Sequence, residues 1–206
     1  MMDGPLLWFL NRGTGVVLLT LLSASVVLGV TAIGGRAAGD GGGRLPRFVT
    51  ASLHRNLALG SVLFLLVHVV TAVVDSYVDI RWWQAFSPVG ATYEPLWTGL
   101  GALALDLMVA VSVTALLRHR LGARSWRTVH LLSWAAWASG VVHGVMIGTD
   151  LRDPSQWTRW ALVPTALSVV AVLLALGWRV SAGAGRHRDA VASAPAREPR
   201  AAEAVR

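Results

Sequence analysis

Five long apolar segments constrain the fold of this chain more than any other feature. Each approaches the roughly 20 residues that an α-helix needs to cross the hydrocarbon core of a bilayer. Only 14% of the residues are charged, against about 25% in an average soluble domain. The sequence therefore predicts an all-α integral membrane bundle of about five transmembrane helices, at Val16–Ile33, His54–Val74, Leu96–Leu117, Val129–Ile147 and Trp160–Trp178.

The distribution of arginine predicts the orientation of these helices. All 18 basic residues are arginine, and about 14 of them lie on one side if the five helices alternate. Cytoplasmic loops carry an excess of basic residues, so we expect the N-terminus outside and the C-terminus in the cytoplasm. The arginines lie between apolar runs rather than on one soluble face. The lipid bilayer of a cell membrane, which we expect to be a bacterial plasma membrane, is therefore the expected partner, and nucleic acid is not.

The chain divides into one membrane domain and two flanking segments. A short N-terminal segment, 1–15, precedes the membrane domain at 16–180, and a tail follows at 181–206. The tail is rich in Ala, Arg, Pro and Glu and has few large apolar residues, which predicts a disordered cytoplasmic segment. Between the second and third spans, Trp82, Trp83 and Phe86 are typical of a segment that lies at the membrane surface.

Four of the six histidines lie within or at the edges of two predicted spans, and polar residues at membrane depth usually have a partner or a function. His54 and His68 are 14 residues apart, and His130 and His143 are 13 apart, which is about 21 Å and 20 Å along a helix. Both spans start on the cytoplasmic side and so run parallel. We therefore expect His54 at the level of His130 near the inner face, and His68 at the level of His143 nearer the outer face.

Two facing imidazoles at one level can bind the iron of a haem from both sides, so two such levels predict a ladder of two haems. The chain has no cysteine, which excludes covalent c-type haem and iron–sulfur clusters. One detail fits less well. At 100° per residue, His54 and His68 point in directions about 40° apart around the helix axis. His130 and His143 point in directions about 140° apart. Either His143 approaches its haem from another side of the helix, or the helix departs from ideal geometry near Gly140.

The two histidine helices, separated by one further helix, resemble the ferric reductase-like transmembrane domain. The stretches "SLHR", "SWRTVH" and "HGVMIGTD" are also similar to that family, and the resemblance covers about residues 10–180. This superfamily includes ferric reductases, NADPH oxidases and bacterial haem-binding quinone-linked subunits. The resemblance implies transmembrane electron transfer through two non-covalent b-type haems. His54 with His130 would bind the inner haem, and His68 with His143 the outer one.

The resemblance also implies what lies at each end of the electron path. Many members have six helices and a cytoplasmic flavin and nicotinamide domain, whereas here only the short stretch 179–206 follows the last predicted span. We therefore expect a separate flavoprotein reductase or a quinol as donor, so that any flavin or quinone belongs to a partner. The acceptor would be ferric iron, oxygen or an extracytoplasmic redox protein. The chain would then be a ferric reductase-like oxidoreductase or an electron-transfer subunit, with no catalytic residue assigned.

Several charged residues have two or more interpretations. Arg55 and Arg127 lie close to the inner histidines and suit the carboxylates of a haem, but positive-inside topology explains them equally well. Arg12, just outside the first span, would serve the carboxylates of the outer haem or have no role, and the second interpretation is favoured. Asp106, near the centre of the third span, would bond a neighbouring helix, orient a ligand histidine, or be protonated without a role.

Three other functions compete with this hypothesis. The chain would be a membrane anchor subunit that oxidises quinol for an enzyme at the outer face. Alternatively, it would be a haem-free, proton-conducting membrane protein whose histidines relay protons, or a purely structural membrane protein. The two matched histidine pairs count against the last two.

Overall fold

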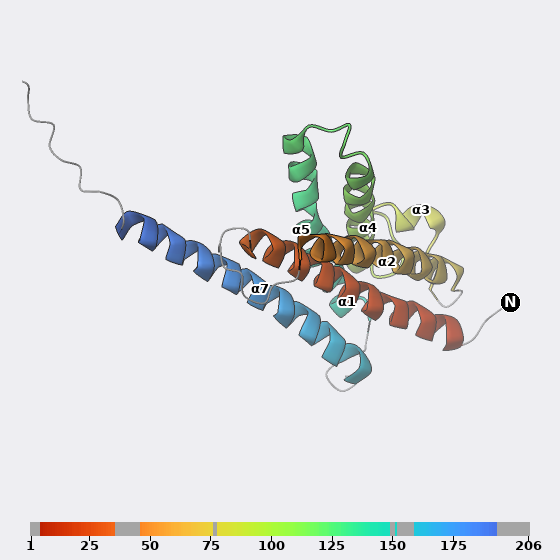
Figure 1. Ribbon diagram of the computed structural model, residues 1–206. Helices are drawn as coiled ribbons and strands as arrows, with labels where there is room; N and C mark the ends of the chain where they lie inside the picture. Colours follow the sequence, from red (N-terminus) through yellow and green to blue (C-terminus); the bar gives the residue numbers. More distant parts are fainter. Residues whose placement is uncertain (1–4, 36–45, 76–77, 149–150, 152–158, 193–206) are drawn as a thin grey trace, which may run out of the picture.

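A computed structural model describes residues 5–35, 46–75, 78–148, 151 and 159–192 (Figure 1). Among these residues it contains helices and connecting turns, and no strand. The predicted all-α class is therefore confirmed. The helices, labelled as in Figure 1, are α1 Pro5–Gly35, α2 Arg47–Val74, α3 Trp82–Ala85, α4 Pro95–Leu116, α5 Ala123–Met146 and α7 Arg159–Ala192.

Within the described residues, four helical stretches are long and apolar enough to cross a membrane. They are Leu6–Ala32, Arg47–Val74, Pro95–Leu116 and Trp160–Ala184. The chain is thus a multi-pass membrane protein. The remaining expected span, Val129–Ile147, lies within α5 except for its last residue, and α5 is not among these four stretches. Its arginines, histidines and small polar residues keep its hydropathy below that of these four stretches.

Two helices extend beyond the boundaries expected for the membrane domain. The segment 1–15 is helical from Pro5 onward and forms the first turns of α1. Proline suits the start of a helix because its missing N–H would have no partner there. At the other end, α7 continues to Ala192, since alanine and arginine favour helix. The tail expected from residue 181 therefore overlaps α7, and its remainder, 193–206, lies outside the described residues.

Helix α1 is the centre of the bundle. It packs against α2, α7 and α5, while α4 packs against α5 in a hairpin. Figure 1 shows α2 and α7 running alongside α1, with the α4–α5 hairpin crossing them. The two helices that carry the histidines, α2 and α5, do not pack closely against each other. Their backbones stay apart, and side chains bridge them.

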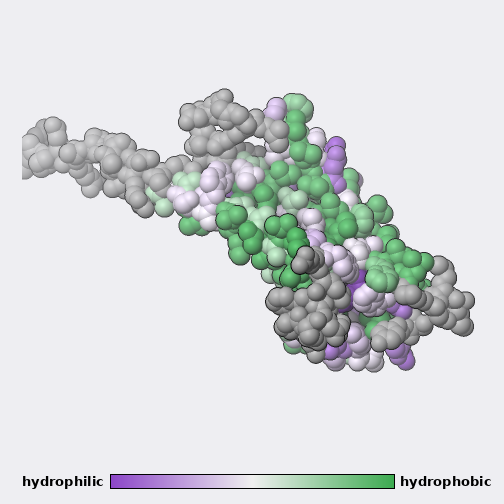
Figure 2. All heavy atoms as spheres, turned by 90° about the horizontal axis from the view of Figure 1, so that it is seen from below, coloured by the Kyte–Doolittle hydropathy of each residue, from purple (hydrophilic) through white to green (hydrophobic). Residues whose placement is uncertain are grey.

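The surface of the bundle is the inverse of a soluble protein's surface. On α2, Leu59, Leu63 and Leu66 are each about 60% exposed, whereas Ser23 and Ser61 are buried in the interior. Apolar residues cover much of the described surface in Figure 2. Large exposed apolar areas are rare on soluble monomers, and small residues at helix contacts let backbones approach closely in membranes. Both features indicate that lipid surrounds these helices.

The connector before α4 has an apolar face and a buried polar residue. Trp82, Trp83 and Phe86 are all more than half exposed. Gln84 is buried: its Oε1 accepts from the Arg81 N–H at 3.0 Å, and its Nε2 donates to the Gly90 carbonyl at 3.2 Å. Aromatic side chains of this kind favour the membrane–water interface. The interfacial location expected from the sequence stays a prediction.

That prediction can be measured because the chain has no cysteine of its own. We expect a fluorophore on Trp82→Cys, in proteoliposomes, to be quenched by nitroxide on lipid headgroups and little by iodide in the water. A fluorophore on Arg120→Cys, in the exposed turn after α4, should show the opposite pattern. Equal iodide quenching at both positions would place the aromatic face in water.

Candidate functional site

The structure brings the four membrane histidines together in two pairs. The ring centroids of His54 and His130 are 6.2 Å apart, with the ring planes at 64°. Those of His68 and His143 are 6.3 Å apart, with the planes at 85°. Each pair joins α2 to α5 at one level, and the two separations are nearly equal. These are the partners that the sequence predicted to share a level.

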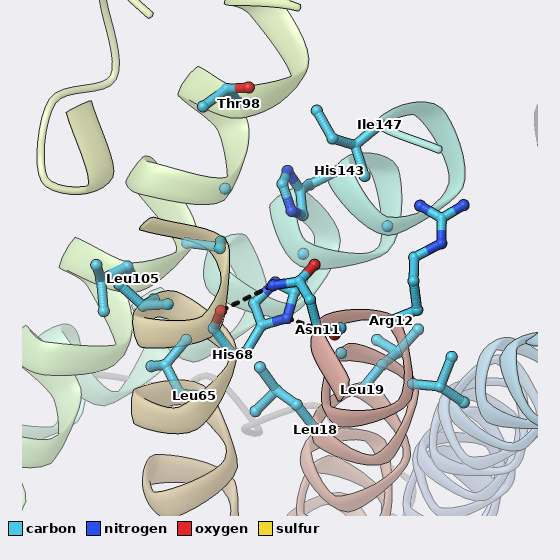
Figure 3. Close-up of a pocket in the computed structure, with 18 of the residues that line it drawn as sticks. Asn11, Arg12, Leu18, Leu19, Leu65, His68, Thr98, Leu105, His143 and Ile147 are labelled. Carbon is cyan, nitrogen blue, oxygen red and sulfur yellow. Dashed lines mark hydrogen bonds between the residues drawn. The ribbon is translucent and has the colours of Figure 1, made fainter. Parts of the chain in front are cut away.

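A cavity of about 210 Å³ surrounds His68 and His143, which we call the outer pair after their expected location (Figure 3). His68 enters it from α2 and His143 from α5, while Asn11 and Arg12 of α1 lie beside them. Apolar side chains such as Leu19, Leu65 and Leu105 make up most of the remaining wall. The outer pair therefore faces a largely apolar space that α1, α2, α3, α4, α5 and α7 all line, with Asn11 and Arg12 as polar groups beside it.

Three of the four imidazoles are oriented in the same way. In each, Nδ1 lies within hydrogen-bonding distance of a backbone carbonyl of a neighbouring helix. The pairs are His54 with Ser25 at 3.0 Å, His68 with Asn11 at 3.0 Å, and His143 with Trp97 at 2.7 Å. Because a carbonyl only accepts, Nδ1 must carry the proton, and Nε2 keeps its lone pair. This is the tautomer in which Nε2 can bind a metal.

A glycine follows each of these three carbonyls by four residues. A Cβ at Gly101 would lie 2.6 Å from the His143 ring. At Gly15 it would lie 3.1 Å from His68, and at Gly29 it would lie 3.7 Å from His54. In a helix, the carbonyl of residue i points toward residue i+4, whose Cβ is tilted back toward it. A glycine at i+4 therefore opens the carbonyl to a second donor, and we call this arrangement a carbonyl–glycine cradle.

The two cradles of α1 repeat with the spacing of the α2 histidines. Asn11–Gly15 and Ser25–Gly29 are 14 residues apart, as His54 and His68 are. Helices α1 and α2 are consecutive, packed and antiparallel. Their equal 14-residue spacings therefore let a single alignment of the two helices put each α2 histidine opposite one cradle of α1. Sequence reasoning missed these residues. The signal was present as two polar residues, each followed by a glycine at i+4, at the same interval as the histidines.

His130 is the exception among the four. Its Nδ1 is buried and has no hydrogen-bond partner among the described residues. Its ring instead stacks on Trp126, one turn earlier in α5, with centroids 5.2 Å apart and planes at 20°. The Trp126 Nε1 is likewise buried without a partner in the described part of the chain.

Two further side chains tie the bundle together. Asn11 Nδ2 of α1 donates to the His68 carbonyl at 2.9 Å and to Thr71 Oγ1 at 3.3 Å. Trp137 of α5, about midway between His130 and His143 in sequence, donates to Ser23 Oγ at 2.8 Å. Hydrogen bonds between membrane helices contribute about 0.6 kcal/mol each. They therefore fix positions and contribute little to the total stability.

The arginines separate into two groups. Arg55 and Arg127 are exposed, next to His54 and one turn before His130. Arg12, for which the interpretation without a role was favoured, lines the outer cavity. Its guanidinium packs against Gly148, where a Cβ would collide with it, and lies 5.1 Å from the centre of the Trp8 ring. Arg12 is therefore part of the outer site.

Asp106 orients none of the four histidines. It lies half-buried on α4, whereas the three bound Nδ1 atoms have backbone carbonyls as partners and the fourth has none within the described residues. This removes one of the three roles expected for Asp106. The other two stay open.

Comparison with protein families matches the chain to the family described as ferric reductase like transmembrane component, over residues 14–141. The matched residues include His54, His68 and His130 and end two residues before His143. Neither the curated proteins nor the solved structures give a match. The match covers more than half of the chain and agrees with the resemblance found in its histidine pattern. The chain therefore belongs to the family of ferric reductase-like transmembrane components.

Proposed function

We propose that this protein carries electrons across a membrane through two b-type haems, one held by His54 and His130 and the other by His68 and His143. Family membership suggests transmembrane electron transfer in general. The observation that carries the proposal beyond this is the equal separation, 6.2 and 6.3 Å, of the two imidazole pairs.

That separation fits one metal ion between each pair of rings. A metal–imidazole bond is about 2.0 Å long, so two rings on opposite sides of one ion have centroids about 6 Å apart. Rings at a tetrahedral angle would be closer, at about 5 Å. The separations of 6.2 and 6.3 Å therefore favour two imidazoles on opposite sides of one ion, and each pair could hold a haem iron in this way.

The histidines are also too few for a bare metal ion. No group of three or more His, Cys, Asp or Glu side chains comes together within the described residues. A bare zinc ion usually takes at least three protein ligands. A pair of imidazoles suits a metal that is already held by a porphyrin, and the apolar wall of the outer cavity suits its rings.

Residues of this chain would hold the haems and orient their ligands. Haem supplies one-electron chemistry when bound. The cradles hold Nε2 of three histidines toward the metal position and keep the proton on Nδ1. Arg12 at the outer level, and Arg55 and Arg127 at the inner level, provide guanidinium groups for the haem carboxylates. The bundle keeps water away from the outer pair.

We place α5 across the membrane as a fifth span, with the N-terminus outside and the C-terminus in the cytoplasm. The excess of arginine on one side supports this orientation. A separate flavoprotein reductase or a quinol would then donate electrons at the cytoplasmic side of a bacterial plasma membrane. Ferric iron, oxygen or an extracytoplasmic redox protein would accept them at the outer side.

The first test is the haem content of the purified protein after haem-replete expression. We expect a reduced-minus-oxidised spectrum of b type and about two haems per chain by pyridine haemochrome. A folded, colourless protein would end this proposal and leave the proton-conducting function as the stronger hypothesis.

A further inference from the structure

The inner histidine of α5 is built differently from the other three. His54, His68 and His143 each have a carbonyl acceptor with a glycine four residues later. His130 has neither, and its buried Nδ1 has no acceptor among the described residues. A buried donor without a partner is costly, and a ligand imidazole without one is free to rotate about its bonds. A contact other than a hydrogen bond to Nδ1 must therefore fix the orientation of the His130 ring.

The part of α4 expected at the level of His130 has no carbonyl–glycine cradle. Helices α4 and α5 run antiparallel, and Trp97 of α4 is opposite His143. The step back along α5 from His143 to His130 therefore corresponds to an equal step forward along α4, from Trp97 to Ala110. The residue four positions later is Thr114 rather than glycine, and its hydroxyl donates to the Ala110 carbonyl at 2.7 Å. The Thr114 hydroxyl therefore already donates to this carbonyl, and no glycine follows it at i+4.

Trp126 restricts the orientation of the His130 ring, for which no carbonyl–glycine cradle is available. Its indole lies one helical turn before His130, where i and i+4 side chains meet. The two rings are nearly parallel, at 20°, and their centroids are 5.2 Å apart. A wide, flat indole against one face of the imidazole restricts its rotation without any hydrogen bond.

We propose that Trp126 is the positioning residue of His130, replacing by ring stacking the carbonyl–glycine cradle that orients the other three histidines. This inference rests on the proposed function, in which His130 is an inner-haem ligand. A histidine whose N–H is hydrogen-bonded is a stronger electron donor to its metal. The inner haem therefore has one strong and one weaker donor, while the outer haem has two strong donors.

The test is made in a His68→Ala background, in which only the inner haem is expected to bind. The g values of a low-spin ferric haem with two imidazole ligands depend on the angle between the imidazole planes. We expect Trp126→Leu to shift or broaden the electron paramagnetic resonance signal of the inner haem. Its affinity for haem should fall by about 10-fold or more, as when other groups behind a metal ligand are removed. Trp126→Phe, which keeps a flat ring, should preserve both.

The controls separate positioning from folding. Trp178→Leu removes a partly exposed indole from α7, which carries none of the four membrane histidines, and should leave the inner-haem signal unchanged. In the otherwise wild-type chain, Trp126→Leu should retain the outer haem, which shows that the bundle is folded. If it loses both haems, Trp126→Met, a flexible side chain without a ring plane, takes its place in the comparison.

The outcomes are distinct from those of the proposed function. A wild-type protein without haem ends the proposed function itself. A haem-loaded wild type in which Trp126→Leu or Trp126→Met leaves the resonance signal and haem affinity of the inner site unchanged overturns only the role of Trp126. A Phe variant that changes the inner haem as much as the Leu variant also overturns it, because stacking would then not matter.

Discussion

Replacing His68 with alanine is expected to reduce the haem content from about two to about one per chain. His68 is one of the two imidazoles of the outer pair, 6.3 Å from the centroid of His143. If the proposed function holds, its loss would leave His143 as the only ligand at this level, in an enlarged apolar cavity. The inner pair lies about 21 Å away along α2 and shares no cradle with it. The remaining haem should therefore keep its spectrum, as measured by pyridine haemochrome and by redox titration of the visible bands.

The matched control is His119→Ala, which removes an exposed histidine in the turn after α4 and should retain both haems. His143→Ala should reproduce the effect of His68→Ala. If both haems survive in His68→Ala, or if His68→Ala and His143→Ala affect different haems, the assignment of the outer pair is wrong.

Replacing Gly101 with alanine is expected to have almost as large an effect, although only one methyl group is added. The new Cβ would lie 2.6 Å from Cε1 and Nδ1 of His143, closer than van der Waals contact allows. The imidazole cannot move aside without losing its 2.7 Å hydrogen bond to the Trp97 carbonyl. We therefore expect loss of the outer haem with the inner haem retained, measured by haem content and by the thermal unfolding of the protein in detergent.

Gly177→Ala is the control, because nothing lies within 4 Å of a Cβ built at that position of α7. It should bind two haems and unfold at a temperature no lower than the wild type, since alanine favours helix over glycine. Gly15→Ala, whose Cβ would lie 3.1 Å from His68, should have a smaller effect than Gly101→Ala. A Gly101→Ala protein with two normal haems would show that the cradle does not constrain His143.

Much of this protein could be predicted from its sequence. The lengths of the apolar runs predict helices because lipid satisfies no backbone hydrogen bonds, so each run must satisfy its own. The nearly equal intervals within the two histidine helices predict which histidines share a level, because the rise per residue of a helix is nearly constant. The first and last residues of the helices were less predictable. Pro5 and the residues after 181 extend α1 and α7, since helix propensity continues where hydropathy ends.

The interval from His130 to His143 shows where such reasoning stops. Two explanations were open, and α5 is an uninterrupted helix through Gly140. A break in the helix is therefore not the reason that His143 meets His68. His143 projects from a different side of α5, toward the Trp97 carbonyl of α4. Which neighbouring helix a side chain faces depends on the angle at which the helices cross. The residue spacing within one helix gives no information about that angle.

The sequence by itself determined the helices, the levels of the histidines and the family, because these depend on local geometry and on lipid as the solvent. Tertiary structure alone decided how each imidazole is held. The carbonyls of Asn11, Ser25 and Trp97 are backbone atoms, which every residue has, and only packing selects the ones that face a histidine. For the same reason Arg12 proved to line the outer cavity, and His130 was found to lie against Trp126 instead of a carbonyl.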